Sequence, residues 1–192
     1  MRYAGNFMTR TLILGGARSG KSAYAERLAA TSGKEVIYIA TAQAHDDEMA
    51  ARIDVHRQQR PAGWTTIEEP LALGAAMRAH STPDNLLLID CLTVWLSNLL
   101  FADGLDFPEV GRITAPPTFV AQRNLFLQAL EQAPGDIVLV SNEVGMGIIP
   151  QGAITRWYVD EAGRLNQVVA AVCERAVWVA AGLPLMLKGA PC

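Results

Sequence analysis

The sequence predicts an α/β fold, a three-layer sandwich in which helices cover both faces of a mostly parallel central sheet. Short apolar runs alternate with longer helical patterns along the 192 residues, an arrangement typical of βαβ units. Charged residues or proline interrupt the apolar runs before they reach the ~20 residues of a membrane-spanning helix, and the runs suit strands buried on both faces. Residues 1–192 are therefore expected to form one domain of ordinary size, with 1–8 as an N-terminal extension.

The predicted elements follow one another without a linker or an internal repeat. A strand at 11–14 leads through a glycine-rich turn into a helix at 21–30, and a second strand spans 35–40. A loop is predicted at 103–118, where glycine and proline gather, and strands at 177–180 and 185–187 should form a C-terminal hairpin around Gly182. The remaining predicted elements are strands at 86–90 and 137–141 and helices at 46–58, 71–80, 92–101, 119–132 and 154–173.

Charge and cysteine content narrow the classes of function. The net charge of −3 provides no basic footprint for nucleic acid, so no nucleic-acid partner is expected. The three cysteines are far apart and form no CxxC pair, which argues against a disulfide framework or a zinc site. These features favour a cytoplasmic protein.

Residues 15–22 match the phosphate-binding pattern G-x-x-x-x-G-K-[ST] in full, between a predicted strand and a predicted helix. Small residues let backbone N–H groups turn towards nucleotide phosphates, and the helix N-terminus adds the positive end of its dipole. Lys21 supplies a point charge for the β and γ phosphates, and the Ser22 hydroxyl is a ligand for Mg²⁺. The alternative is a glycine-rich turn without a ligand. The predicted phosphate contacts are Gly15, Gly16, Ala17, Arg18, Ser19, Gly20, Lys21 and Ser22.

Polar residues at the ends of the predicted strands are the next candidates, because ligands of open α/β sheets bind beyond the carboxyl ends of the strands. These residues are Thr41, Asp90, Asn142 and Glu143. Asp90 is predicted to hold Mg²⁺ directly or through water, and the alternative is that it caps the helix at 92–101. For Glu143, a role in the crevice and a structural role both stay open.

The predicted helix at 46–58 carries His56 between Arg52 and Arg60, each four residues away. Nearby positive charge disfavours the imidazolium form, and a neutral imidazole is a competent nucleophile towards phosphorus. Taken alone, the pattern is more typical of a solvated helix face. His45, close to the start of this helix, is interpreted as a surface residue.

Seven segments together resemble one enzyme family. They are GGARSGKS at 15–22, IAT at 39–41, DDEMAARI at 46–53, H-R-x-x-R-P at 56–61, W-x-x-x-E at 64–68, SNEVGMGIIP at 141–150 and AGRLNQ at 162–167. In this order they resemble the bifunctional adenosylcobinamide kinase/adenosylcobinamide-phosphate guanylyltransferases of cobalamin biosynthesis. The resemblance runs from Thr11 to about Lys188.

The resemblance implies a RecA-like P-loop fold, a homotrimer, and adenosylcobinamide and adenosylcobinamide phosphate as substrates. ATP or GTP would phosphorylate the aminopropanol hydroxyl, and GMP would then pass from GTP to that phosphate, releasing pyrophosphate and giving adenosylcobinamide-GDP. The guanylylated histidine of the family falls on His56, which joins Lys21 and Asp90 as the implied catalytic residues. The nucleotide contacts implied outside the phosphate loop are Ala40, Thr41, Ala42, Arg57, Gln58, Gln59, Arg60, Glu68 and Asp90.

Two chemical interpretations accompany this resemblance. The Glu68 carboxylate can accept from the N1–H and N2–H₂ groups of guanine, and Arg57 and Arg60 can neutralise charge on phosphates. The alternatives are a plain P-loop kinase of small molecules and a GTP-dependent switch that binds proteins. The switch is disfavoured because the sequence has no separate guanine-reading loop of the N-K-x-D type.

Overall fold

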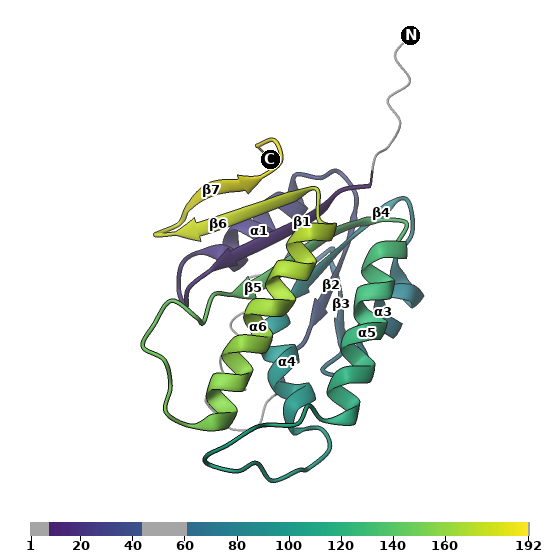
Figure 1. Cartoon of the computed structure of the whole chain (residues 1–192). Coiled ribbons are helices and arrows are strands. Elements are labelled where there is room, and N and C mark those ends of the chain that lie inside the picture. The colour runs from purple at the N-terminus through teal and green to yellow at the C-terminus, as the bar shows by residue number, and fades with distance from the viewer. Residues whose placement is uncertain (1–7, 44–60, 192) are drawn as a thin grey trace.

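A seven-stranded sheet forms the centre of the molecule (Figure 1), in a computed structural model that describes residues 8–43 and 61–191. The strands lie in the order β3-β2-β4-β5-β1-β6-β7. The first six are parallel to one another, and β7 pairs antiparallel with β6. Their bounds are β1 Arg10–Gly15, β2 Glu35–Ala40, β3 Thr65–Glu68, β4 Asn85–Asp90, β5 Asp136–Asn142, β6 Arg175–Ala180 and β7 Leu183–Lys188.

Helices cover both faces of this sheet and complete three layers. Helix α1 packs on one face through Ala25 and Ala29. The other face is covered by α3, α4, α5 and α6, which lie side by side in Figure 1. The bounds of the helices are α1 Lys21–Ala30, α3 Leu73–His80, α4 Leu92–Phe101, α5 Pro117–Gln132 and α6 Ala153–Val172.

The central strands are buried on both faces, which explains why they appear in the sequence as continuous apolar runs. Leu12 and Leu14 of β1 face the core under α4, α5 and α6, whereas Ile13 between them faces the core under α1. This alternation is the two-residue period of a strand. Because β1 to β6 run parallel, the loops that follow them all lie at one edge of the sheet, here called the carboxyl edge. The opposite edge is called the amino edge.

The predicted α/β class, the mostly parallel sheet and the C-terminal hairpin are confirmed. The hairpin turns at Ala181 and Gly182, whose φ angles are 51° and 76°. Most predicted strands and helices are present within a few residues of their predicted ends. Within the described ranges, no helix is long and apolar enough to cross a membrane.

Three details of the prediction differ from the structure or fall outside it. The edge strand β3 was not predicted, because its four residues are mostly exposed and show no apolar alternation. The loop predicted at 103–118 ends two residues early, since α5 begins at Pro117, and proline suits the first position of a helix. The helix predicted at 46–58 lies outside the described residues.

Candidate functional site at the carboxyl edge

The phosphate-binding pattern forms a tight loop between β1 and α1. Within the loop, the N–H of Ser19 donates to the carbonyl of Gly16 at 3.3 Å. A Cβ at Gly15 would lie 2.5 Å from the Ser19 hydroxyl and 2.5 Å from the carbonyl oxygen of Val179, so only glycine fits there. Gly20 has a φ of 94°, which glycine adopts readily. Gly15 and Gly20 therefore allow the tight turn that connects the loop to the N-terminus of α1.

The first turn of α1 is available to an anion. Gly20 is the N-cap residue and has no side chain to satisfy the first N–H groups of the helix. Lys21 lies back over the loop, where its Nζ donates to the carbonyl of Gly16 at 3.3 Å. Among the described residues, the buried hydroxyl of Ser19 has no hydrogen-bond partner. The N–H groups of the first turn and the Lys21 ammonium are hydrogen-bond donors suited to phosphate oxygens.

Asp90 ends β4 at the same edge of the sheet, with β5 between it and the phosphate loop. The alternative that Asp90 caps α4 is wrong, because Cys91 is the N-cap residue and the helix has no side-chain cap. Burial raises the pKa of the Cys91 thiol, the charge of Asp90 raises it further, and the charge of Lys21 lowers it. Asp90 and Lys21 therefore act electrostatically on one buried thiol.

The residues proposed for Mg²⁺ fit that ion through their chemistry. Ser22 and Asp90 offer a hydroxyl and a carboxylate oxygen, the ligand types that Mg²⁺ prefers. In residues 8–43 and 61–191, no group of three or more His, Cys, Asp or Glu side chains could hold a metal ion alone. A magnesium ion at this edge would need the phosphate oxygens of a nucleotide and water as further ligands, as is usual at nucleotide sites.

Thr41 connects the end of β2 to the start of α4. Its hydroxyl accepts from the N–H of Cys91 at 2.9 Å and donates to the carbonyl of Cys91 at 2.8 Å. The side-chain amide of Asn98 donates to the carbonyl of Thr41 at 2.7 Å. Thr41 is fully buried, so its side chain holds the edge together. The structure thus places this predicted nucleotide contact among internal contacts.

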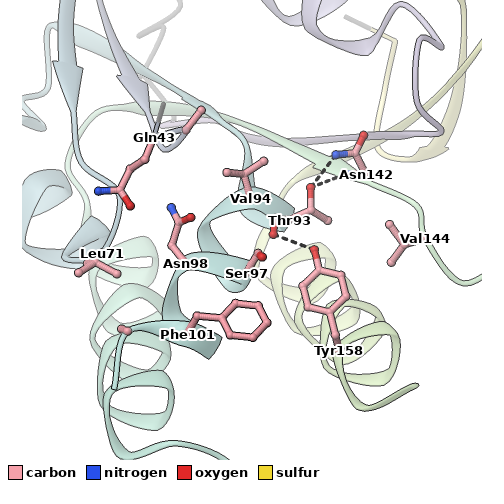
Figure 2. A pocket seen from close by; sticks show the side chains of 12 residues that line it. Gln43, Leu71, Thr93, Val94, Ser97, Asn98, Phe101, Asn142, Val144 and Tyr158 are labelled. Atoms are coloured by element: carbon pink, nitrogen blue, oxygen red, sulfur yellow. Dashed lines mark hydrogen bonds between the residues drawn. The ribbon is translucent and has the colours of Figure 1, made fainter. Parts of the chain in front are cut away.

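Asn142, Thr93 and Tyr158 form a hydrogen-bonded group next to the phosphate loop (Figure 2). The amide of Asn142 donates to the Thr93 hydroxyl at 2.7 Å, and the Tyr158 hydroxyl donates to the Thr93 carbonyl at 2.8 Å. Asn142 pairs in register with Gly15, the first residue of the loop. Burial raises the pKa of Tyr158 to about 12, with a smaller contribution from Cys91, so the hydroxyl stays protonated at neutral pH. Sequence reasoning identified Asn142 but missed Thr93 and Tyr158, which no local pattern connects.

Glu143 and Glu68 take different places at this edge. The Glu143 carboxylate accepts from the N–H of Gly145 at 2.5 Å, which favours a structural role in the turn after β5. Glu68 ends β3 and pairs in register with Ala40 of β2. Four strand spacings separate β3 from β1, or roughly 19 Å at about 4.8 Å each. The structure does not bring Glu68 beside the phosphate loop.

Several predicted site residues lie outside the described residues, namely His56, Arg57, Gln58, Gln59 and Arg60, as does His45, which was interpreted as a surface residue. In the sequence they belong to the connection between β2 and β3, the two strands whose ends carry Ala40 and Glu68. Ala42, after β2, lines a cavity of about 540 Å³ along α4.

The glycine-rich loop from β1 into α1, its lysine and the carboxylate at the end of β4 define a P-loop nucleotide-binding protein. A family model described as "Cobinamide kinase / cobinamide phosphate guanyltransferase" matches residues 11–187. The chain belongs to this family.

Relatives of established name cover nearly the whole chain. It is 53% identical over 182 residues to the bifunctional adenosylcobalamin biosynthesis protein CobP of Pseudomonas aeruginosa, covering 95% of this chain and 99% of the relative. It is 42% identical over 179 residues to the bifunctional adenosylcobalamin biosynthesis protein CobU of Escherichia coli, covering 92% and 98%.

Solved structures support the fold. The chain resembles a prototypical ATPase from the type III secretion system of pathogenic bacteria with a TM-score of 0.54 and 15% identity. The match covers 93% of this chain and 56% of the ATPase chain. At this identity the likeness concerns the P-loop fold alone.

Proposed function

We propose that this chain phosphorylates adenosylcobinamide and then transfers GMP from GTP to the new phosphate, giving adenosylcobinamide-GDP. The observation that carries the proposal is the phosphate loop on β1 and α1, with Lys21 lying over it and Asp90 at the same edge of the sheet, two strands away. Membership of the cobinamide kinase and guanyltransferase family supports the two reactions and the acceptor.

The kinase reaction uses the loop to position a nucleoside triphosphate, ATP or GTP. The hydroxyl oxygen of the acceptor attacks the γ phosphorus, the bond from that phosphorus to the β–γ bridging oxygen breaks, and the nucleoside diphosphate leaves while the hydroxyl loses its proton. Lys21 and the amides of the first turn of α1 hold the phosphates and stabilise their charge. Ser22 and Asp90 would hold Mg²⁺, which supplies further positive charge at the phosphates.

The guanylyl transfer is assigned to His56. Its imidazole nitrogen attacks the α phosphorus of GTP, the bond to the α–β bridging oxygen breaks, and pyrophosphate leaves. A phosphate oxygen of the acceptor then attacks the same phosphorus, and the phosphorus–nitrogen bond breaks to regenerate the histidine. The covalent intermediate separates attack at the α phosphorus from the γ transfer, which a single nucleotide pose serves poorly.

The recognition of guanine is assigned to Glu68, with Arg57 and Arg60 beside the transferred phosphate. The separation between Glu68 and the loop, roughly 19 Å from strand spacing, supports a GTP pose for guanylyl transfer that differs from the pose for the kinase step. The connection carrying His56 joins β2 to β3, so its sequence position suits that second pose.

We also propose that the single domain acts as a cytoplasmic homotrimer. Exposed apolar side chains on the edge strand β7 support self-association, since Leu183, Leu185 and Leu187 are 72%, 61% and 56% exposed. Analytical ultracentrifugation tests this directly. A monomer at micromolar concentration would contradict it.

The two-step function is tested by incubating the chain with cobinamide, Mg²⁺ and α-³²P-GTP. The proposal expects labelled cobinamide-GDP, pyrophosphate, and an acid-labile label on the protein when cobinamide is left out. A plain P-loop kinase would give cobinamide phosphate and GDP without labelled protein. That result would limit the function to the first reaction.

A further inference from the structure

A cavity of about 540 Å³ lies at the carboxyl edge against α4, and the phosphate loop does not account for it. Its volume falls within the range of about 300–1,000 Å³ typical of small-molecule sites. Ser97 and Phe101 project into it from α4, between Leu71 on one side and Tyr158 on the other (Figure 2). The other lining residues are Ala42, Gln43, Thr93, Val94, Asn98, Ala102, Asn142 and Val144.

The cavity adjoins the start of the phosphate loop, which the proposed kinase reaction uses to hold the nucleotide. Asn142, in its lining, pairs in register with Gly15, and the N–H of Glu143 donates to the Gly15 carbonyl at 3.0 Å. Thr93 follows Asp90 by three residues in the chain. One end of the cavity is therefore next to the start of the phosphate loop.

The chemistry of the lining suits an uncharged, partly apolar group. None of the lining residues carries a charge, so the cavity offers no ionic partner to a phosphate or carboxylate. Leu71, Val94 and Phe101 provide apolar walls. Ser97 and Gln43 add a hydroxyl and an amide to the lining, and these groups can bind a polar ligand atom.

We infer that this cavity receives the acceptor arm of cobinamide, with the reacting hydroxyl at the end formed by Asn142 and Thr93. This inference rests on the proposed kinase function and assigns its second substrate site. A neutral alcohol fits an uncharged cavity beside the loop, whereas the nucleotide keeps its phosphates among the donors of Lys21 and α1. The Asn142–Thr93–Tyr158 hydrogen bonds hold this end in place.

Phe101→Ala tests the assignment with little risk to folding, because the ring is 58% exposed. Loss of an apolar wall should raise the Kd for cobinamide, measured by equilibrium dialysis, and its KM in the kinase assay by about tenfold. The Kd for GTP should change less than about twofold. Phe107→Ala is the matched control, since it removes the same contact between the two rings, at 6.0 Å, without touching the cavity.

A second pair of variants fills the cavity or adds equal bulk elsewhere. Ser97→Trp should block cobinamide binding, whereas Ala121→Trp on the exposed surface of α5 should leave it unchanged. If Phe101→Ala and Ser97→Trp bind cobinamide as the wild-type chain does, the assignment is overturned. Weakened GTP binding with normal cobinamide binding also overturns it and gives the cavity to the nucleotide.

The failure of this assignment is distinguishable from failure of the proposed function. A wild-type chain that converts cobinamide, together with variants of unchanged KM, removes only the cavity assignment. A wild-type chain that neither binds nor converts cobinamide overturns both.

Discussion

Polar side chains gather at both edges of the parallel sheet, but they serve different partners. At the amino edge, Arg10 is 7% exposed, and its guanidinium donates to the carbonyls of Leu130, Glu131 and Ala133 at 2.7, 3.1 and 3.3 Å. These are carbonyls at the end of α5, which the helix itself leaves without donors. Arg10 also forms an ion pair with Glu174 at 3.6 Å. The polar atoms of this edge thus satisfy the protein's own backbone.

At the carboxyl edge, by contrast, two polar groups have no internal partner. Among the described residues, the hydroxyl of Ser19 and the carboxylate of Asp90 have no hydrogen-bond or ion-pair partner. Unpaired polar groups at a sheet edge cost stability unless a ligand or water satisfies them. Polar contacts therefore stabilise the fold at both edges, but the carboxyl edge also leaves polar groups free to bind a ligand.

Lys21→Ala, at the carboxyl edge, should have the largest effect, a loss of catalysis without a loss of stability. Loss of the charge over the loop should lower kcat/KM for nucleoside triphosphate by about 10²–10³-fold, because Lys21 stabilises phosphate charge in the transition state. The melting temperature should change little. Lys34→Ala is the control at the amino edge, where Lys34 pairs with Asp136 at 2.9 Å, and it should leave turnover intact. Near-normal turnover by a folded Lys21→Ala chain would contradict the assignment.

Arg10→Met, at the amino edge, should lower the stability of the fold and leave nucleotide binding nearly unchanged. Three carbonyls, two of them in buried hydrogen bonds, lose their donor, so the free energy of unfolding in urea should fall by about 2–4 kcal/mol. The Kd for GTP, measured on the folded protein, should stay within about twofold. Arg112→Met, on the exposed surface, should change the free energy of unfolding by less than about 0.5 kcal/mol. Equal stability of the two variants would show that Arg10 is not a structural connector.

Asp90→Asn tests whether the Asp90 carboxylate is a ligand of Mg²⁺. Removal of the negative charge should raise the Mg²⁺ concentration for half-maximal kinase activity by about 10–100-fold, because a carboxylate ligand is lost. Asp136→Asn is the paired variant at the amino edge, where Asp136 accepts from the N–H of Thr9 at 2.8 Å. Its magnesium dependence should match the wild type. An unchanged dependence in Asp90→Asn would leave Asp90 without a metal role.

Substitution of Cys173, at the amino edge between α6 and β6, should have a smaller effect on stability, and this effect should depend on pH. Burial, and then the charge of Glu174, raise the pKa of its thiol from 9.0 to about 12. A raised pKa means that the folded state binds the proton more tightly, so this contribution to stability is complete below pH 9 and is lost as pH rises towards 12. The urea midpoint of Cys173→Ala should therefore decline less over this range. Parallel declines would contradict the prediction.

The sequence predicted the central layers and the phosphate loop because both follow local rules. The motif at 15–22 and the apolar runs are contiguous, and their periods identify the elements. Asp90 was found because it ends such a run. Its alternative role as a helix cap could be removed only by the backbone geometry at Cys91.

Contacts between distant segments could not be predicted in this way. Tyr158 and Thr93 meet across 65 residues, and Arg10 reaches carbonyls about 120 residues away. Neither pair leaves a periodic signal. Strand β3 escaped prediction because an exposed edge strand needs no apolar pattern, and the distance of Glu68 from the loop depends on its place in the strand order.

The proposed function has the carboxyl edge serve two transfers, the second through His56. Acid-labile labelling by α-³²P-GTP in the wild-type chain, His56→Asn and the control His45→Asn tests this directly. Wild type and His45→Asn should retain the label, whereas His56→Asn should lose the label and guanylyl transfer but keep γ transfer to cobinamide, which needs only positioning and charge stabilisation. A labelled His56→Asn chain would contradict the claim.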